Sequence, residues 1–434
     1  MAGAGPGAPR RLLMVAYHFP PLAGSSGIQR TLRLVQQLPA LGWQPLVLTT
    51  HARAYERVAP DLLAEVPPGT EVRRAFALDT ARHLSIGGRY VGALAVPDRW
   101  QTWRFDGIRQ GMQLIRRFKP DAIWSTFPIA TAHLIAMELQ RRSGLPWVAD
   151  FRDPMAQDGY PTDPRLWQAF DRIERAALGQ AARSVFTTPG AARIYTQRYP
   201  DVADRTRVIE NGYDEDSFAR AERGTDVIEP LAPGAVTLLH SGIVYPEERD
   251  PAPLMAALGQ LRAAGRVGPK NLRLRFRSAV HDKLIRDLAV QHGVDEMVET
   301  LPAVGYAEAL EEMLRADGLL VMQSAGCNEQ IPAKTYEYLR AGRPILCLTD
   351  PAGDTAGVLR GAGIPDIGRL DDAADIARAL TGFLDKLAAG RPSLPSPTAV
   401  RQASRQGRSE EYASLLDALV NADPAATRPA PAHR

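Results

Sequence analysis

The sequence predicts an α/β protein made of two doubly wound, Rossmann-like domains. Its 434 residues are too many for one ordinary hydrophobic core. Near the start, the apolar run Leu12–Tyr17 has the character of a strand buried on both faces, and a small-residue loop and a helix follow it. The same order of strand, loop, helix and strand recurs at residues 318–348. Repeated units of this kind build parallel sheets.

Both halves of the chain continue this pattern. In the first half, the helix Ile28–Leu41 has apolar residues at helical spacing and ends at Gly42. Further elements of the first half are the strands Leu46–Leu48, Ala122–Thr126, Trp147–Phe151, Val185–Thr188 and Arg207–Ile209 and the helix Ala130–Arg142. The second half is expected to contain the strands Val236–His240, Leu272–Phe276, Val298–Leu301, Gly318–Met322 and Ile345–Leu348, and the helices Pro253–Ala264, Tyr306–Arg315, Ala333–Arg340 and Ser404–Val420.

The chain is expected to divide into two domains joined by a linker, with short segments at both ends. The predicted order is a disordered arm at 1–10, a first domain at 11–220, a linker at 221–234, a second domain at 235–400, a C-terminal helix at 401–421 and a disordered tail at 422–434. The tail is assigned as disordered because it is rich in Ala and Pro and poor in large apolar residues.

The overall composition is that of a soluble globular protein, with 45% apolar and 23% charged residues. Two cysteines, Cys327 and Cys347, cannot form a disulfide scaffold, and neither has a His or Cys nearby at metal-ligand spacing. The run Leu12–Tyr17 is too short for a signal-peptide core. No span of about 20 apolar residues exists, so the sequence predicts no membrane crossing and a cytoplasmic location.

The net charge of +3 conceals an asymmetry between the two parts of the chain. Residues 1–150 hold 18 Lys and Arg against 10 Asp and Glu, a balance of +8, whereas the remainder has a balance of −5. A basic half fits contact with anionic lipid headgroups or with a pyrophosphate-linked acceptor, and it equally fits scattered solvated arginines. Nucleic acid is not an expected partner, because no recognition motif accompanies the charge.

Residues 324–347 carry the pattern that is most specific for function. Two glutamates, Glu329 and Glu337, have seven residues between them and follow the predicted buried strand Gly318–Met322. The helix Ala333–Arg340 then stops at Gly342. A polar loop at the carboxyl end of a strand, with a helix whose amino end is presented to an anion, is typical of a nucleotide site. Taken alone, the pair also fits two solvated glutamates.

This segment resembles the donor site of the family-4 retaining glycosyltransferases of the GT-B fold. In that family, the second glutamate of a Glu-x7-Glu motif binds the ribose hydroxyls of a nucleotide sugar, and the first lies near the transferred sugar. The resemblance gives these roles to Glu337 and Glu329 and makes Ile331, Ala333 and Lys334 substrate-binding residues. It also implies two Rossmann-like domains facing a cleft, with the C-terminal helix crossing back to the first domain.

The opening of the chain is similar to the same family. The family's Gly-rich loop lies near the donor phosphates and the acceptor, which makes Gly24, Ser25, Gly27 and Arg30 candidates for substrate contact. The segments DAIWSTFP and PWVADFRDP add Thr126 and Arg152. Many relatives have a histidine where this chain has Ser125-Thr126-Phe127, and His133 lies too far along to replace it. An Asp150–Arg152–Asp153 brace of the loop is an equally good interpretation.

The cations that neutralise the donor pyrophosphate are only partly matched. Relatives have a glycine, an arginine and a later lysine or arginine after the first strand of the second domain. Here Gly242 and Arg249 match, but Ile243 stands where the first cation is expected, so Lys334 or Arg152 is the candidate substitute. The pair Asp214 and Asp216 could be a manganese motif, although its charged, loop-like surroundings favour a solvated hinge.

The resemblance, which runs from about Leu12 to about Leu419, implies a metal-independent retaining glycosyltransferase. It would move a hexose from a nucleotide diphosphate sugar to a glycan, lipid-linked or small-molecule acceptor hydroxyl in cell-envelope polysaccharide, glycolipid or secondary-metabolite synthesis. Glu329 and Arg249 are the expected catalytic residues, and no cofactor besides the donor is expected. A location on the inner face of the cell membrane is consistent with the basic half. The alternatives are a non-catalytic GT-B partner subunit and a sugar-nucleotide epimerase of the same fold.

Overall fold

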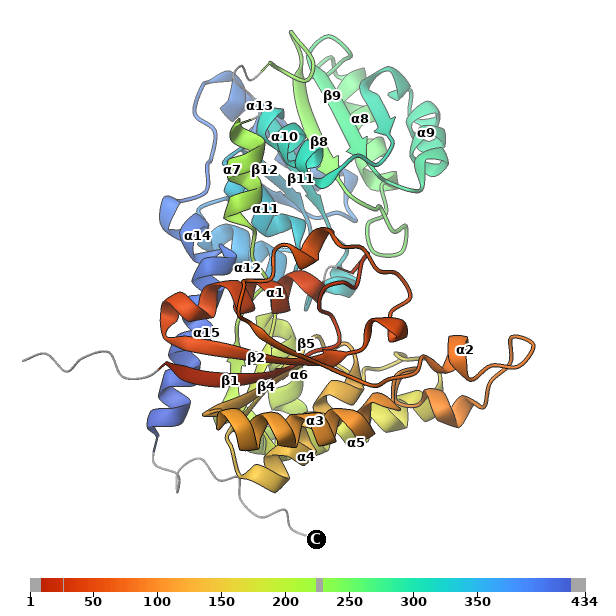
Figure 1. The fold of residues 1–434 in the computed structure, drawn as a ribbon. Helices are drawn as coiled ribbons and strands as arrows, with labels where there is room; N and C mark the ends of the chain where they lie inside the picture. Colours follow the sequence, from red (N-terminus) through yellow and green to blue (C-terminus); the bar gives the residue numbers. More distant parts are fainter. Residues whose placement is uncertain (1–8, 26, 224–228, 423–434) are drawn as a thin grey trace, which may run out of the picture. The chain divides into compact units, whose positions relative to one another are not determined.

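The computed structural model describes residues 9–25, 27–223 and 229–422 (Figure 1). Most of the expected N-terminal arm at 1–10, part of the expected linker at 221–234 and nearly all of the expected tail at 422–434 lie outside the described residues. The chain forms two compact units. The first comprises the residues up to Glu210 together with those from Arg408 onward, and the second runs from Asn211 to Gly407.

The first unit contains a seven-stranded parallel sheet with the strand order β3-β2-β1-β4-β5-β6-β7. Its strands are β1 (Arg10–Val15), β2 (Trp43–Thr50), β3 (Glu71–Ala75), β4 (Ala122–Thr126), β5 (Trp147–Arg152), β6 (Arg183–Phe186) and β7 (Thr206–Val208). Its helices are α1 (Gly27–Gln37), α2 (Thr80–His83), α3 (Trp103–Phe118), α4 (Ala130–Ser143), α5 (Pro164–Gln180), α6 (Pro189–Arg198) and most of α15 (Arg405–Asn421). The strand order reverses between β1 and β4, where doubly wound sheets bind ligands.

Helices cover both faces of this first sheet, which explains why its central strands are apolar without alternation. Helices α3 and α4 lie on one face and α1 on the other (Figure 1). Leu13 in β1 pairs with Leu46 on one side and Ile123 on the other, and all three are fully buried. Four fully buried tryptophans fill the core around them: Trp43, Trp103, Trp124 and Trp147.

The second unit contains a six-stranded parallel sheet with the strand order β10-β9-β8-β11-β12-β13. Its strands are β8 (Val236–Ser241), β9 (Leu272–Arg277), β10 (Val298–Leu301), β11 (Gly318–Met322), β12 (Ile345–Leu348) and β13 (Ile367–Gly368). Its helices are α7 (Glu215–Arg223), α8 (Ala252–Ala263), α9 (Asp282–Gln291), α10 (Tyr306–Arg315), α11 (Lys334–Ala341), α12 (Asp354–Gly361), α13 (Ala373–Ala388) and α14 (Pro397–Gln402).

The second sheet is also buried on both faces. Leu238 and Leu320 belong to the hydrophobic cluster on one face, whereas their neighbours Leu239 and Val321 belong to the cluster on the other. The strands β11 and β12 are therefore buried at every position and have continuous apolar runs, whereas β9 alternates between buried apolar residues and arginines.

The expected elements and the observed ones differ at several ends. The helix expected to reach Leu41 ends at Gln37, because Pro39 begins a short 3-10 turn that continues to Leu41. The second unit starts at Asn211, earlier than the expected boundary at 220, because α7 packs against α10. Helix α11 starts at Lys334 and ends before Gly342, whose φ of 64° is the left-handed conformation that commonly closes a helix.

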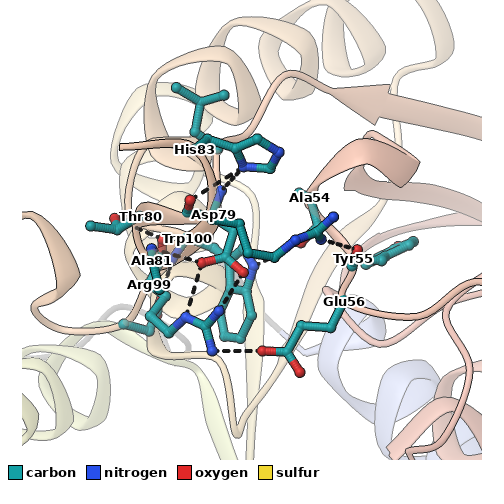
Figure 2. A network of polar contacts seen from close by, with 12 residues as sticks. Ala54, Tyr55, Glu56, Asp79, Thr80, Ala81, His83, Arg99 and Trp100 are labelled. Atoms are coloured by element: carbon teal, nitrogen blue, oxygen red, sulfur yellow. Dashed lines mark hydrogen bonds and ion pairs between the residues drawn. The ribbon is translucent and has the colours of Figure 1, made fainter. Parts of the chain in front are cut away.

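A long connection between β3 and α3 is held by one buried carboxylate (Figure 2). Asp79 accepts from Arg99 at 2.9 Å to Oδ1 and 2.5 Å to Oδ2, and Arg99 also donates to Glu56 at 2.6 Å. Trp100 follows in sequence and donates from Nε1 to the carbonyl of Ala54 at 3.0 Å. The connection is thereby fixed beside Tyr17, whose ring contacts that of Trp100, at the end of β1.

Candidate functional site

Two side chains of the second unit, those of Lys334 and His240, meet beside the backbone of Gly242 where β8 ends. Gly242 follows this strand with a φ of 118°, and a Cβ atom placed on it would lie only 3.1 Å from Nζ of Lys334. The Lys334 ammonium is also 3.0 Å from Nε2 of His240, and Nδ1 of His240 is 3.0 Å from the carbonyl oxygen of Leu320. Because that carbonyl can only accept, we assign the proton to Nδ1, which leaves Nε2 to accept from the ammonium.

The electrostatics of this group favour an anionic ligand. Lys334 is half-buried, and its ammonium is the enclosed part; burial and the nearby charge of Arg249 lower the pKa of Lys334 to about 7. Burial and the charge of Lys334 lower the pKa of the His240 imidazole well below its ordinary value, so His240 is neutral. At neutral pH the lysine is thus only partly charged, and a bound anion would favour its charged form.

Arg249 lies in the loop that connects β8 to α8. Its Nη1 donates to the carbonyl of Ile243 at 2.7 Å, and its guanidinium lies 5.4 Å from the centre of the Tyr245 ring. Its Nε is buried without a hydrogen-bond acceptor among the described residues. The backbone N–H of Ser324 donates to the carbonyl of Glu248 at 2.7 Å, so this loop is joined to the loop that follows β11.

Glu337 lies on the first turn of α11, three residues after Lys334, which begins the helix. Its Oε1 accepts from the hydroxyl of Tyr306 at 2.8 Å, and burial raises the pKa of its carboxyl group. Lys334 and Arg405 oppose this shift through their charges. The structure therefore brings four of the predicted residues, Glu337, Lys334, Gly242 and Arg249, into one region of the second unit, while their roles stay predictions.

Glu329 is exposed on a loop that hydrogen bonds from Gln323 and Asn328 hold in place. Gln323 donates from Nε2 to the carbonyls of Cys327 and Gln330, at 2.8 and 3.0 Å, and Asn328 donates to Asp350 at 2.7 Å. Farther along the loop, the predicted contact residue Ile331 is buried in the core, whereas Ala333 is exposed just before α11. The role predicted for Glu329 thus has a rigid support, while Ile331 can offer only its backbone to a ligand.

In the first unit, two predicted contact residues belong to a buried polar network. Arg30 donates from Nε and Nη2 to the two carboxylate oxygens of Asp150, both at 2.9 Å. Thr126 and Tyr412 also donate to Asp150, each at 2.9 Å, and Arg30 donates to the Tyr412 hydroxyl at 2.9 Å. Asp150 is fully buried. Substrate contact by Arg30 and Thr126 stays a prediction, but this geometry gives both a structural role.

His133 does not take the place of the family histidine, because it is buried in the core of the first unit. His133 is fully buried, its Nδ1 is 2.8 Å from Oγ of Ser125, and Trp147 donates to the same hydroxyl at 2.9 Å. Burial lowers the pKa of His133 to about 4. His133 is therefore a neutral core residue, in agreement with its interpretation from the sequence.

The remaining predicted residues of the first unit lie at the ends of β1 and β5. Gly24 has a φ of 79°, and Oγ of Ser25 accepts from the N–H of Gly27 at 3.3 Å. Gly27 lies against Arg152 and against His18, which the sequence analysis did not single out. No role was predicted from the sequence for His18 or His240. Each follows an apolar run, and a polar residue at the carboxyl end of a predicted strand is the signal that could have identified them.

No group of three His, Cys, Asp or Glu side chains that could hold a metal ion occurs within residues 9–25, 27–223 and 229–422. Asp214 is buried and accepts from the hydroxyl of Ser217 at the start of α7. Both cysteines are buried as free thiols. None of the described helices has the length and apolar character that a membrane crossing requires.

A cavity of about 750 Å³ lies at the opposite edge of the second sheet. It is lined at the amino ends of β8 and β12 by Val236, Asp317, Gly342 and Pro344, and by residues of α13. None of the perturbed groups described above lines it. We therefore place the candidate site at the carboxyl edge of the sheet and not in this cavity, because the charged groups with shifted pKa values lie at the carboxyl edge.

Comparison with known proteins identifies the fold. Residues 26–212 match the family model of the glycosyl transferase 4-like domain. Sucrose-phosphate synthase from Thermosynechococcus elongatus is similar in structure, with a TM-score of 0.60 and 15% identity over 95% of this chain and 100% of that one. Residues 26–212 thus match a glycosyl transferase 4-like domain, and the chain as a whole has the GT-B fold.

Other structures of this fold have similarly low sequence identity. HepE from Anabaena in complex with UDP has a TM-score of 0.63 and 14% identity over 94% of this chain and 100% of that one. A glycosyltransferase from Rickettsia africae has a TM-score of 0.63 and 10% identity over 95% of this chain and 99% of that one. At such identities the likeness concerns the fold. No curated protein sequence matches this chain.

Proposed function

We propose that this glycosyltransferase moves a hexose from a nucleoside diphosphate sugar to an acceptor hydroxyl, with retention of anomeric configuration and without a metal ion. The observation that carries the proposal is the Lys334 ammonium packed on the backbone of Gly242, beside the neutral His240 and at the amino end of α11. A cation that is partly discharged by burial, in a place where a helix offers its amino end, is suited to a diphosphate.

The chemical problem of the reaction is charge. As the glycosidic bond breaks, negative charge grows on the diphosphate and positive charge grows on the anomeric carbon. Arg249, Lys334 and the N–H groups at the start of α11 would stabilise the diphosphate, which is the role that a metal ion has in other enzymes. Ile243 adds no cation, so its carbonyl instead orients Arg249.

The two glutamates would bind the other parts of the donor. Glu337, oriented by the hydroxyl of Tyr306, would accept from the ribose hydroxyls. Glu329 would orient the hydroxyls of the transferred sugar from its braced loop. HepE has been crystallised with UDP and with UDP-glucose, so uridine nucleotides are the first donors to test.

For the acceptor, we propose a glycan, a lipid-linked sugar or a small molecule of cell-envelope or secondary-metabolite synthesis. The balance of +8 in residues 1–150 supports an anionic acceptor and contact with anionic lipid at the inner face of the membrane. No cofactor besides the donor takes part in the proposed reaction.

Glu337→Ala should weaken both UDP and the nucleotide sugar by about 10- to 150-fold, because a charge-assisted hydrogen bond to a buried hydroxyl contributes about 1.5–3 kcal/mol. Calorimetric titration would measure both affinities, and the unfolding midpoint would show that the variant is folded. Glu308→Ala, which removes an exposed carboxylate from α10, is the matched control. Unchanged affinities in a folded Glu337 variant would remove the ribose role and, with it, this donor site.

Transfer should continue in excess chelator, because protein cations and backbone N–H groups are proposed to carry the diphosphate charge. The double variant Asp214→Asn with Asp216→Asn should keep most activity, since asparagine can still accept from Ser217. Product formation from a radiolabelled donor would measure both effects. Activity that chelation abolishes and manganese restores would contradict the proposed mechanism.

A further inference from the structure

The end of β5 has an unusual backbone that turns one arginine out of the sheet's regular pattern. The pairing of β5 with β6 shifts register between Asp150 and Arg152. Arg152 has a φ of 62°, and the N–H of Asp153 donates to the carbonyl of Phe151 at 2.7 Å, which closes a three-residue turn around it. A left-handed arginine in such a turn is strained. Bulges re-aim side chains, and local strain of this kind is concentrated at functional sites.

The side chain of Arg152 is directed at the first residue of α1. A Cβ atom placed on Gly27 would lie 3.0 Å from Nη1 of Arg152 and 2.9 Å from Nδ1 of His18. A guanidinium and an imidazole therefore lie against the backbone at the amino end of an 11-residue helix. Glycine is required at this point, because any side chain would displace both groups.

Arg152 forms no ion pair within the part of the chain that the structure describes, although the carboxylates of Asp153 and Asp150 are near enough to act on its charge. Its side chain makes no hydrogen bond or ion pair there, and its Nε is buried without an acceptor. The nearby carboxylate of Asp150 is engaged by both arms of Arg30, by Thr126 and by Tyr412. An enclosed guanidinium that no carboxylate contacts directly is costly to keep, and burial lowers the pKa of Arg152 more than these charges raise it, so its retention points to an external anion.

The neighbours of Arg152 agree with an anionic ligand. The first turn of α1 contains no acidic residue, so the positive end of the helix dipole is not neutralised there. Burial and the charge of Arg152 lower the pKa of His18 to about 4, so the imidazole is neutral and can donate one hydrogen bond. The Arg152 guanidinium, the His18 imidazole and the amino end of α1 therefore surround one position at Gly27.

We propose that Arg152, His18 and the amino end of α1 form a binding site for an oxyanion of the acceptor, a phosphate or a carboxylate group. The guanidinium fork would bind two oxygens and the imidazole a third. The assignment to the acceptor rests on the proposed function, in which the donor diphosphate has its own cations, Arg249 and Lys334, in the second unit. The oxyanion site itself rests only on the geometry of the first unit.

The test is a calorimetric titration of the full-length protein with inorganic phosphate, and separately with acetate, in the presence of saturating UDP. The informative variant is Arg152→Gly, because glycine adopts a positive φ without strain and the change removes only the side chain. We expect phosphate or acetate to bind the parent protein, and to bind Arg152→Gly about 10- to 150-fold more weakly. Arg152→Lys should fall between the two, and Arg104→Gln, an exposed cation on α3, should match the parent.

The unfolding midpoint separates a binding role from a structural one. Arg152→Gly should unfold at the same temperature as the parent or a higher one, since the backbone strain is relieved. Equal anion affinity in parent and variant, or a clear loss of thermal stability in Arg152→Gly, would overturn the proposal. Displacement of phosphate by UDP would assign the oxyanion to the donor and overturn the acceptor assignment. If UDP itself does not bind, the proposed function fails, while the titration without UDP still reports on Arg152.

Discussion

Arg249→Ala is expected to lower turnover by about 100-fold or more, the scale of losing one preorganised electrostatic donor. The diphosphate gains negative charge in the transition state, so the loss should appear in kcat more than in the affinity for the donor. Ile243 leaves this loop without a second cation at the expected position, and Arg249 is therefore difficult to replace. Steady-state kinetics with a nucleotide sugar would separate kcat from KM.

Three further measurements sharpen this test of Arg249. Arg249→Lys should recover part of the activity, because a point charge still neutralises phosphate without the bidentate fork. A nucleoside, which has no phosphates, should bind the alanine variant as well as it binds the parent. Arg378→Ala removes an exposed arginine from α13 and should leave turnover unchanged. Near-normal turnover of Arg249→Ala would leave Lys334 as the cation for the diphosphate.

Asp150→Ala is expected to lower the free energy of unfolding of the first unit by about 3–5 kcal/mol, the cost of breaking a buried ion pair from one side. The change leaves Arg30 charged and largely buried, and it removes the acceptor of the Thr126 and Tyr412 hydroxyls. All six tryptophans of the chain belong to residues 43–167, so tryptophan fluorescence during urea unfolding reports on this unit.

A matched surface pair provides the control for the Asp150 variant. Asp171 bonds Arg175 on the exposed side of α5, and Asp171→Ala should cost less than about 1 kcal/mol because solvent screens that pair. Replacing both buried partners, with Arg30→Met and Asp150→Leu, should restore part of the lost stability, since no charge is then stranded. A loss below 1 kcal/mol in Asp150→Ala would show that solvent or another anion compensates Arg30.

The sequence predicted the central strands of both sheets well because they are buried on two faces, but it did not predict the edge strands β3 and β13. A strand such as β11 must be apolar throughout, and the run Gly318–Met322 was recognised with the bounds that the structure shows. Helix ends were less accurate, because the effect of Pro39 on α1 competes with an apolar pattern that continues to Leu41. The glycine at position 342 could be assigned correctly because a left-handed helix end favours that residue.

The site could be predicted only where its residues are close in sequence. Lys334 and Glu337 stand on one turn of one helix, and spacing alone places them together. The bond from Lys334 to His240 crosses 94 residues, and that from Arg30 to Asp150 crosses 120. The sequence contains no local signal for such pairs, nor for the bulge that redirects Arg152, because each depends on how distant strands align in the sheet.

The position of α15 has a consequence for the order in which the protein can be assembled during synthesis. This helix provides Tyr412 to the buried Arg30 and Asp150, and its Asp417 accepts from Arg10 and from the indole of Trp43. The second unit is one continuous stretch, Asn211–Gly407, and is synthesised before those residues. Domains generally fold as units while the chain emerges. The unit whose synthesis begins first is thus completed only after the second unit has been synthesised, and until then the surface that Leu416 and Leu419 cover stays exposed.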